Sequence, residues 1–599
     1  NTLVIQFLYI YVFENFKHHF GDNKNTMVIG VINPNIFELS NYNAWVNLTH
    51  ELNDIPGVES TTSIDDLSLL VKDSVQKSFN TIPWYKKEDQ SQEAFNKSVD
   101  QLMAQPFYKD LFYNDESKAS LMLVSINKEI LKTKEREGLI QLIHQKGEVF
   151  AQKQNLTLHY SGLPYIRTVN SIQIKKEISL FIILTLLITA LILYLFFRSA
   201  RVTLICMFVV ITGVIWSFGS MAIFGFEISI IMALVPPVIV VIGIPNCIFL
   251  LNKYHKEFKR HKNKIKAISR IINKVGNITL LTNLSTASGF AAFVLTKSQT
   301  LKEFGLIASM NIMLIFLFSL ILIPIALSYF DPPKRKHTQH LDKKWIKYAV
   351  NTLIHLVQHK RTQIYIVTIL VVTLGVFGIF QIRTTGNLTD DLPKSGVLYK
   401  DIKFFENHFS GVMPTEILLE SKKKNGVMKL SVLQKIAALQ TVLDSFPEIS
   451  RTISIADFAK YSKQSFYNGD SSFYMLPNTQ EKSWILSYAK GMQEDNKLSE
   501  IPFTDSLNQI TRISMRMADI STPRLDSLME FLQPKINKIF DSEKYNVSMT
   551  GSSIVFLNGT KYLVRNLFTS LFLVIVLISI FMAWMFNSFR MVVVSLVPN

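Results

Sequence analysis

Long apolar segments constrain this 599-residue chain more than any other feature. Hydrocarbon gives backbone amides no partner, so a segment of about 20 apolar residues crosses a bilayer as a helix. Seven segments come close to that length and predict membrane spans at 178–197, 202–224, 228–251, 278–296, 304–329, 363–381 and 566–586. An eighth span begins near Met591. The chain is therefore expected to be a polytopic α-helical membrane protein.

Two long polar stretches alternate with these spans, and their mixed composition is typical of folded, water-exposed domains. The expected parts are a first extracytoplasmic α/β domain at 1–170, a five-helix transmembrane unit at 171–330, a basic cytoplasmic linker at 331–361, a transmembrane helix at 362–381, a second extracytoplasmic α/β domain at 382–561, and a helix with the start of the next at 562–599. Soluble and membrane-embedded parts therefore alternate along the chain.

The formal net charge of +17 is concentrated in the links between predicted spans. Basic residues crowd the connections at 253–274 and 334–361 and the short link Arg198–Arg201. If each span crosses the bilayer once, all three links lie on one side, which is the positive-inside pattern. Both polar domains then lie outside the cytoplasm of a multi-pass cell-membrane protein, with the bacterial inner membrane favoured. This explains the basicity without a nucleic-acid partner.

One basic segment, Tyr254–Val275, is expected to form a helix on the inner leaflet, with membrane lipid as its partner. Its isoleucines fall on one side of that helix: Ile265, Ile268, Ile271 and Ile272. Electrostatic docking on anionic lipid and simple marking of the topology both remain open as its role.

The remaining sequence argues against a cofactor, a metal site or catalysis. Cys206 and Cys247 are the two cysteines, and both fall inside predicted spans, so the polar domains have no disulfide framework. The histidines lack partners with metal-ligand spacing, and glycine-rich phosphate loops are absent. No nucleophile, base and orienting group can be assembled, so the chain is predicted not to be an enzyme.

An internal repeat relates the two halves at an offset of 389 residues. The offset carries Phe16 onto Phe405 and Gly162 onto Gly551, among other pairs. By the same offset, one span is expected before residue 1 and several after Asn599. The intact protein is thus expected to have roughly twelve spans, with this chain truncated at both ends.

Each polar domain contains the pattern strand, helix, strand twice. In the first domain these units are 25–64 and 119–162, separated by a polar helical insert, and in the second they are 415–455 and 512–552. A pair of such units indicates a split ferredoxin-like, porter-type α/β fold.

Local motifs add a resemblance to a known superfamily. Lys302–Leu327, with its Phe-Gly opening, is similar to the sixth helix of resistance-nodulation-division (RND) transporters, and Leu280–Thr296 resembles the fifth. Phe20–Asp22 resembles the segment that opens the first exposed domain. With the order of the domains, the chain resembles the branch that includes MmpL lipid exporters, hopanoid exporters, Patched and Niemann-Pick type C proteins. The resemblance implies an RND transporter whose five spans from 178 to 329 form a sterol-sensing-domain-like unit.

Proton-driven members of this family carry a proton-relay Asp in the fourth helix. This sequence departs from the family there, because Pro245 occupies the position of that Asp. Proline cannot take up and release a proton, which argues against a simple relay in this half. The candidates for a transport path are polar and uncharged: Asn246, Thr282, Asn283, Ser285, Thr286 and Ser288. Ordinary helix packing is the alternative role for these residues. The candidates for breaking a helix are Pro236, Pro237 and Pro245.

The leading functional hypothesis is export or relocation of a hydrophobic or amphiphilic molecule, with lipid as one class. The alternatives are a sterol-sensing-like lipid receptor or scaffold without proton-driven transport, and a SecDF-like accessory of protein export. A homo-oligomer is left open as the assembly.

Overall fold

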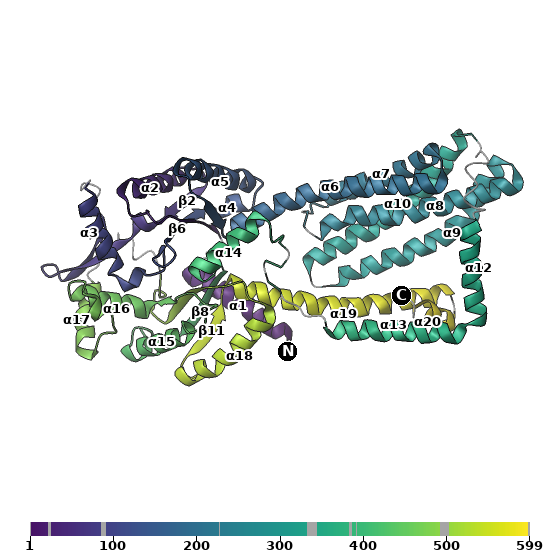
Figure 1. Ribbon diagram of the computed structural model, residues 1–599. Coiled ribbons are helices and arrows are strands. Elements are labelled where there is room, and N and C mark those ends of the chain that lie inside the picture. The colour runs from purple at the N-terminus through teal and green to yellow at the C-terminus, as the bar shows by residue number, and fades with distance from the viewer. Residues whose placement is uncertain are drawn as a thin grey trace. The chain divides into compact units, whose positions relative to one another are not determined.

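The computed structural model describes residues 2–21, 25–85, 91–226, 228–229, 231–296, 298–331, 344–381, 386–387, 389–390, 392–411, 413–490, 502–586 and 588–596 (Figure 1). Its internal contacts divide the chain into two compact units, each built from two stretches of sequence. We call Asn1–Asn170 with Thr384–Lys561 the α/β unit. Ser171–Arg383 with Tyr562–Asn599 is the helical unit.

The first sheet of the α/β unit has the strand order β2-β6-β1-β7, and β5 also pairs with β6. Every pairing in it is antiparallel. The strands are β1 Thr26–Ile32, β2 Val58–Thr62, β5 Tyr113–Asn114, β6 Ala119–Ile126 and β7 Leu158–Ser161. Helices α2 (Leu39–Asn53) and α5 (Glu135–Gln154) lie on one face of the sheet (Figure 1). The short helix α4 (Lys128–Leu131) precedes α5 in the chain.

The insert of the first domain is not purely helical, which corrects the prediction. It begins with η2 (Ile64–Asp66) and an antiparallel hairpin, β3 (Ser68–Asp73) and β4 (Ser78–Pro83), before α3 (Gln92–Met103) and η3 (Pro106–Tyr108). The hairpin is anchored by residues from the second half of the chain, because the Leu70 N–H donates to the Tyr461 hydroxyl at 3.0 Å. Tyr461 also stacks on Phe107, with ring centroids 4.8 Å apart.

The second sheet has the strand order β11-β8-β10-β9, again with antiparallel pairing. Its strands are β8 Met413–Glu420, β9 Ile453–Ser454, β10 Ile510–Met517 and β11 Asn546–Thr550. Its helices are α15 Leu430–Leu443, α16 Ile455–Phe466, η7 Ser471–Phe473, α17 Thr479–Lys490 and α18 Thr522–Ile539. The two sheets share one strand order. In the first sheet β1 lies between β6 and β7, and β2 pairs with β6; in the second sheet β8 lies between β10 and β11, and β9 pairs with β10.

Two aromatic helices are exchanged between the halves of the α/β unit. Helix α1 (Thr2–Phe20) buries Phe13, Phe16 and Phe20 in a cluster with Leu418 of the second sheet. Helix α14 (Val397–Phe409) buries Phe404, Phe405 and Phe409 in a cluster with Ala119 and Leu121 of the first sheet. Each helix therefore covers a face of the sheet that belongs to the other half of the sequence.

The helical unit contains long apolar helices, of which α6, α7, α8, α9 and α10 run in similar directions (Figure 1). The helices of this unit, two of which (α6 and α19) begin in the α/β unit, are α6 Leu163–Phe197, α7 Ala200–Ile223, η4 Met232–Leu234, α8 Val235–His261, α9 Lys264–Ala291, η5 Ala292–Leu295, α10 Gln299–Tyr329, α12 Lys344–His359, α13 Arg361–Gln381, α19 Ser552–Phe586 and α20 Phe589–Leu596. Residues 332–343 of the predicted basic linker lie outside the described residues.

Five helices among the described residues are long and apolar enough to cross a membrane. They are Leu163–Phe197, Ala200–Ile223, Met232–His261, Gln299–Tyr329 and Arg361–Gln381. The span predicted at 278–296 corresponds to a shorter apolar helix, Thr279–Leu295, because the first part of α9 is polar. The span predicted at 566–586 lies within α19.

Candidate functional site

A pair of asparagines forms the centre of the candidate site, between α8 and α9. The Asn246 side-chain amide donates to Asn283 Oδ1 at 3.0 Å, and the Asn283 amide donates back to Asn246 Oδ1 at 2.9 Å. The Asn283 amide also donates to the Thr279 carbonyl at 2.7 Å. Both side chains are buried, so each amide satisfies the other in apolar surroundings. We call Asn246 and Asn283 the amide pair.

The structure does not bring the other path candidates into the amide pair. The Thr286 and Ser285 hydroxyls both donate to the Thr282 carbonyl, at 2.9 Å each, and Ser288 donates to the Leu284 carbonyl at 2.8 Å. These hydroxyls bond to their own helix, which is the usual way in which an apolar helix carries Ser and Thr. Asn246 and Asn283 thus connect different helices, whereas the Ser285, Thr286 and Ser288 hydroxyls bond within α9.

The prolines do not interrupt α8, which corrects the expectation of a broken helix. Pro236 and Pro237 lie in its first turn, where a missing N–H costs nothing because those amides have no partner within the helix. Pro245 lies inside the helix, yet α8 continues from Val235 to His261. Pro245 is exposed, whereas the next residue, Asn246, is buried in the amide pair.

A second buried amide links two other helices, and the sequence analysis did not identify it. Asn311 of α10 donates to the Ser220 hydroxyl of α7 at 2.9 Å and to the Ile307 carbonyl at 2.8 Å. Both Asn311 and Ser220 are buried. The sequence did contain a signal of this contact: Asn311 is a lone asparagine in the apolar run that follows Phe304, and a polar group in a span needs a partner.

Small residues bring these helices together. A methyl group at Gly213 of α7 would lie 2.4 Å from Ile315 Cδ1 of α10, and one at Gly243 of α8 would lie 3.0 Å from Ile315 Cγ1. Ile315 therefore occupies space that two glycines leave open on neighbouring helices. Close packing of this kind is the main attraction between helices in lipid, where no hydrophobic effect acts between them.

The predicted basic helix at Tyr254–Val275 is in fact two helix ends joined by a turn. Helix α8 ends before Lys262, which has a left-handed conformation (φ 49°), and Asn263 caps α9 by accepting from the Lys266 N–H at 3.0 Å. Glu257 is buried beside this turn and lies 3.1 Å from Arg270 and 3.8 Å from Lys253. This ion pair fixes the start of α9 against the end of α8.

The α/β unit contains a different kind of buried polar group. Glu416 of β8 is buried and accepts from the Ser514 hydroxyl at 2.7 Å. Burial raises the pKa of Glu416 to about 7, although Arg512 and Ser514 oppose the shift. Desolvation lowers the pKa of Arg512 in turn. The Arg512 guanidinium lies over the Phe20 ring of α1, 5.4 Å from its centroid.

Chemically, the amide pair is neutral at every pH and cannot carry a proton. Its donors and acceptors can hold helices together or line a hydrated path once the pair separates. Among the described residues, no cluster of three or more His, Cys, Asp or Glu side chains is arranged to bind a metal ion. The site is therefore a hydrogen-bonding site without a titratable group.

Comparison with known proteins gives two matches. The model of the MMPL family matches residues 62–351, which include most of the first sheet and the helices of the amide pair. The chain is also 23% identical over 252 residues to a Methanocaldococcus jannaschii protein whose name describes it as a membrane protein. That match covers 42% of this chain and 59% of the relative's length.

Proposed function

This chain belongs to the MMPL family of RND-type membrane transporters through residues 62–351, and we propose that it exports or relocates a hydrophobic or amphiphilic molecule, with lipid as the first class to test. The protein performs no chemical step on that molecule in this proposal. Its partners are the substrate and membrane lipid, and nucleic acid is not among them.

The observation that carries the proposal is the neutral character of the two buried amide contacts in the apolar parts of the matched helices. The buried carboxylate of Glu257 lies beside the basic turn that joins α8 to α9. The amide pair and the Ser220–Asn311 contact are uncharged. An ionic solute would need an opposite charge in or near the spans, because an uncompensated ion in low dielectric is costly. An amphiphile needs only hydrogen-bond donors and acceptors beside apolar surface.

We further propose that the α/β unit lies outside the cytoplasm and consists of two ferredoxin-like domains from one duplicated unit. The equal strand orders of the two sheets support the duplication. The basic links around α8, α9 and α12 support the orientation, since they would all lie on the cytoplasmic side. Attachment of a membrane-impermeant thiol reagent to Glu116→Cys and Lys424→Cys, both at exposed positions, from outside intact cells tests it, and protection of either position contradicts it.

The second candidate is a lipid receptor or scaffold without proton-driven transport. It is favoured by Pro245 and the neutral amide pair, which leave this half without a group to couple a proton gradient to movement. The two candidates differ in what a pH gradient does to lipid movement.

The test uses the full-length protein in proteoliposomes that contain a fluorescent phospholipid, with and without an imposed pH gradient. Transport predicts that labelled lipid moves between leaflets faster when the gradient is present. The Asn246→Leu, Asn283→Leu double variant should reduce that movement, whereas Ser309→Ala, which removes a hydroxyl that bonds to its own helix on α10, should not. If the rate of movement between leaflets is the same with and without the pH gradient for every amphiphile, the result supports the receptor or scaffold instead.

A further inference from the structure

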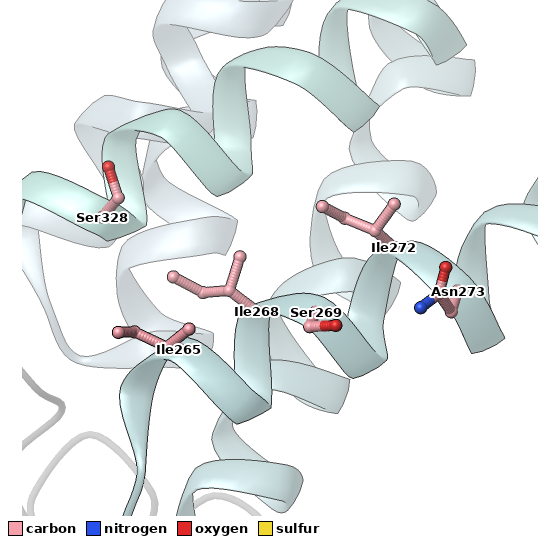
Figure 2. Close-up of a pocket in the computed structure, with 6 residues that line it drawn as sticks. All are labelled: Ile265, Ile268, Ser269, Ile272, Asn273 and Ser328. Atoms are coloured by element: carbon pink, nitrogen blue, oxygen red, sulfur yellow. The ribbon is translucent and has the colours of Figure 1, made fainter.

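A groove lies between the first turns of α9 and the end of α10, outside the amide pair. Its volume is about 380 Å³, and it is lined by Ile265, Ile268, Ser269, Ile272, Asn273 and Ser328. Figure 2 shows the three isoleucines in a row on α9, with Ser328 carried by another helix. We call this feature the isoleucine groove. Its volume lies at the lower end of the range for small-molecule sites.

The floor of the groove is apolar and accessible. Ile265 is 80% exposed and Ile272 is 42% exposed, although both lie in a polar stretch of the chain. Full burial of an exposed isoleucine contributes roughly 1.5–3 kcal/mol, and these side chains in water would lose a share of it that grows with their exposure. An apolar occupant is therefore favoured.

The surroundings of the groove are strongly basic. Residues 253–270 contain eight Lys or Arg and one acidic residue, Glu257. The Glu257 carboxylate is engaged by Arg270 and Lys253, so the positive charge at Lys262 and Lys266 is not offset within this segment. These two lysines flank the start of α9: Lys262 lies three residues before the first groove isoleucine, Ile265, and Lys266 directly follows it.

Lys264 lies next to the groove, where it contacts the backbone of the groove residue Ser328. Its ammonium donates to the Ser328 carbonyl at 2.6 Å and to the Phe330 carbonyl at 2.8 Å, which ties α9 to the end of α10. An ammonium has three donors, so one N–H remains for a further acceptor. Ser269 and Asn273, one turn apart on the groove and both exposed, add neutral donors.

We propose that the isoleucine groove binds one anionic phospholipid of the cytoplasmic leaflet, with an acyl chain on the isoleucines and the phosphate near Lys262 and Lys266. An apolar row flanked by lysines is the pattern of a helix that lies in a membrane interface. The chain continues from the groove into the apolar part of α9, which holds the groove at the depth of lipid headgroups. The proposal depends on the membrane location but not on transport.

The test uses the full-length protein with Cys206 and Cys247 replaced by alanine and a fluorophore attached to Ile265→Cys. The protein is placed in phosphatidylcholine vesicles that contain a small fraction of either phosphatidylglycerol or phosphatidylcholine with a nitroxide on an acyl chain. Nitroxide-phosphatidylglycerol should quench the label more effectively, with a preference of about fivefold for each lysine engaged. A label on Ile211→Cys, an exposed apolar residue of α7, should be quenched equally by both lipids.

Charge variants identify the source of the preference. Lys262→Gln with Lys266→Gln should remove most of it, while Lys97→Gln with Lys128→Gln, the same charge change in the α/β unit, should leave it intact. Equal quenching of Ile265→Cys by the two lipids would overturn the proposal, because it would mean apolar contact without headgroup recognition. Absence of quenching would also overturn it and would indicate that a protein segment fills the groove. Neither result bears on lipid movement across the membrane.

Discussion

The two sheets of the α/β unit share a strand order, but the faces that the aromatic helices cover differ in chemistry. On the first sheet, Gly30 pairs with Leu121, and the rings of Phe404 and Phe405 from α14 lie against Gly30. On the second sheet, the corresponding pair is Leu418 with Arg512.

The neighbouring pair differs in the same way. Val28 faces Leu123 in the first sheet, whereas Glu416 faces Ser514 in the second. An apolar face therefore lies under α14, and a buried carboxylate and guanidinium lie under α1. The two sheets therefore have the same backbone pairing and strand order, whereas the side chains on the covered face depend on the helix that packs against it.

At the edge of this covered face, a polar contact joins the first sheet to α14. His159 of β7 lies 2.9 Å from the Asp401 carboxylate of α14 and stacks on Phe404, with ring centroids 4.1 Å apart. A histidine on the first sheet thus fastens the exchanged helix α14, whereas the buried Glu416 and Arg512 of the second sheet lie beneath α1.

The largest expected effect tests what the sheets have in common. Gly162 and Gly551 follow the last strand of each sheet at φ 98° and 114°, and an added methyl would lie 2.4 Å from the Thr26 carbonyl oxygen or 2.7 Å from that of Pro414. Gly162→Ala and Gly551→Ala should each destabilise the α/β unit by about 4 kcal/mol through strain and overpacking. Thermal unfolding followed by tryptophan fluorescence measures this.

Gly138→Ala, at a helical glycine with open space around it, is the control and should not lower stability. If only one of the two turn variants were destabilised, the shared architecture would not rest on this turn.

Glu416→Gln should show the next largest effect, and only in the second sheet. Because the folded pKa of about 7 exceeds the ordinary value of 4.5, the native state holds its proton more tightly, and stability is lost as pH rises from about 4.5 to 7. The variant keeps a neutral group, so it should exceed the wild type by up to about 3 kcal/mol at pH 8 and equal it near pH 4. Urea unfolding at both pH values measures this. Glu129→Gln, at an exposed position, should change neither value.

Gly30→Ala tests the apolar face of the first sheet. The added methyl would lie 2.5 Å from Phe404 Cε1 and 2.9 Å from Phe405 Cε1, so one ring must move. A loss of about 2 kcal/mol is expected from overpacking. Gly219→Ala, with nothing within 4 Å, is the matched control. An unchanged midpoint for Gly30→Ala would mean that α14 does not pack on this sheet.

Phe20→Leu should give the smallest effect. It removes the ring that lies over the Arg512 guanidinium and beside Phe16, at a cost of about 1 kcal/mol. Phe20→Tyr keeps the ring and should retain most of that stability. Equal losses from both variants would show that α1 covers the charged pair by shape alone, without a contribution from the ring.

Much of the strand pattern could be predicted because it is local. Short apolar runs in Thr26–Ile32 and Ala119–Ile126 mark buried strands, and the helices between strands follow the 3.6-residue period. The hairpin at Ser68–Pro83 was missed because its burial comes from residues far away in the chain, among them Tyr461.

The candidate site was predictable only in part. Asn246 and Asn283 stand out as polar residues in apolar runs, but so do Thr282 and Ser288, and composition alone does not say which of them meets another helix. Rotation of each helix about its axis decides that, and it is fixed by packing such as that of Ile315 against Gly213 and Gly243.

The sequence by itself determined that this chain crosses a membrane, since segments of sufficient length and hydropathy have no other stable environment. It also determined where the polar domains lie along the chain. Only the tertiary structure decided that α1 and α14 are exchanged, that the amide pair joins α8 to α9, and that a groove opens beside α10. The amide pair joins residues 37 positions apart, and the contacts of α1 and α14 join residues much farther apart. The choice of such contacts depends on shape complementarity that no local pattern encodes.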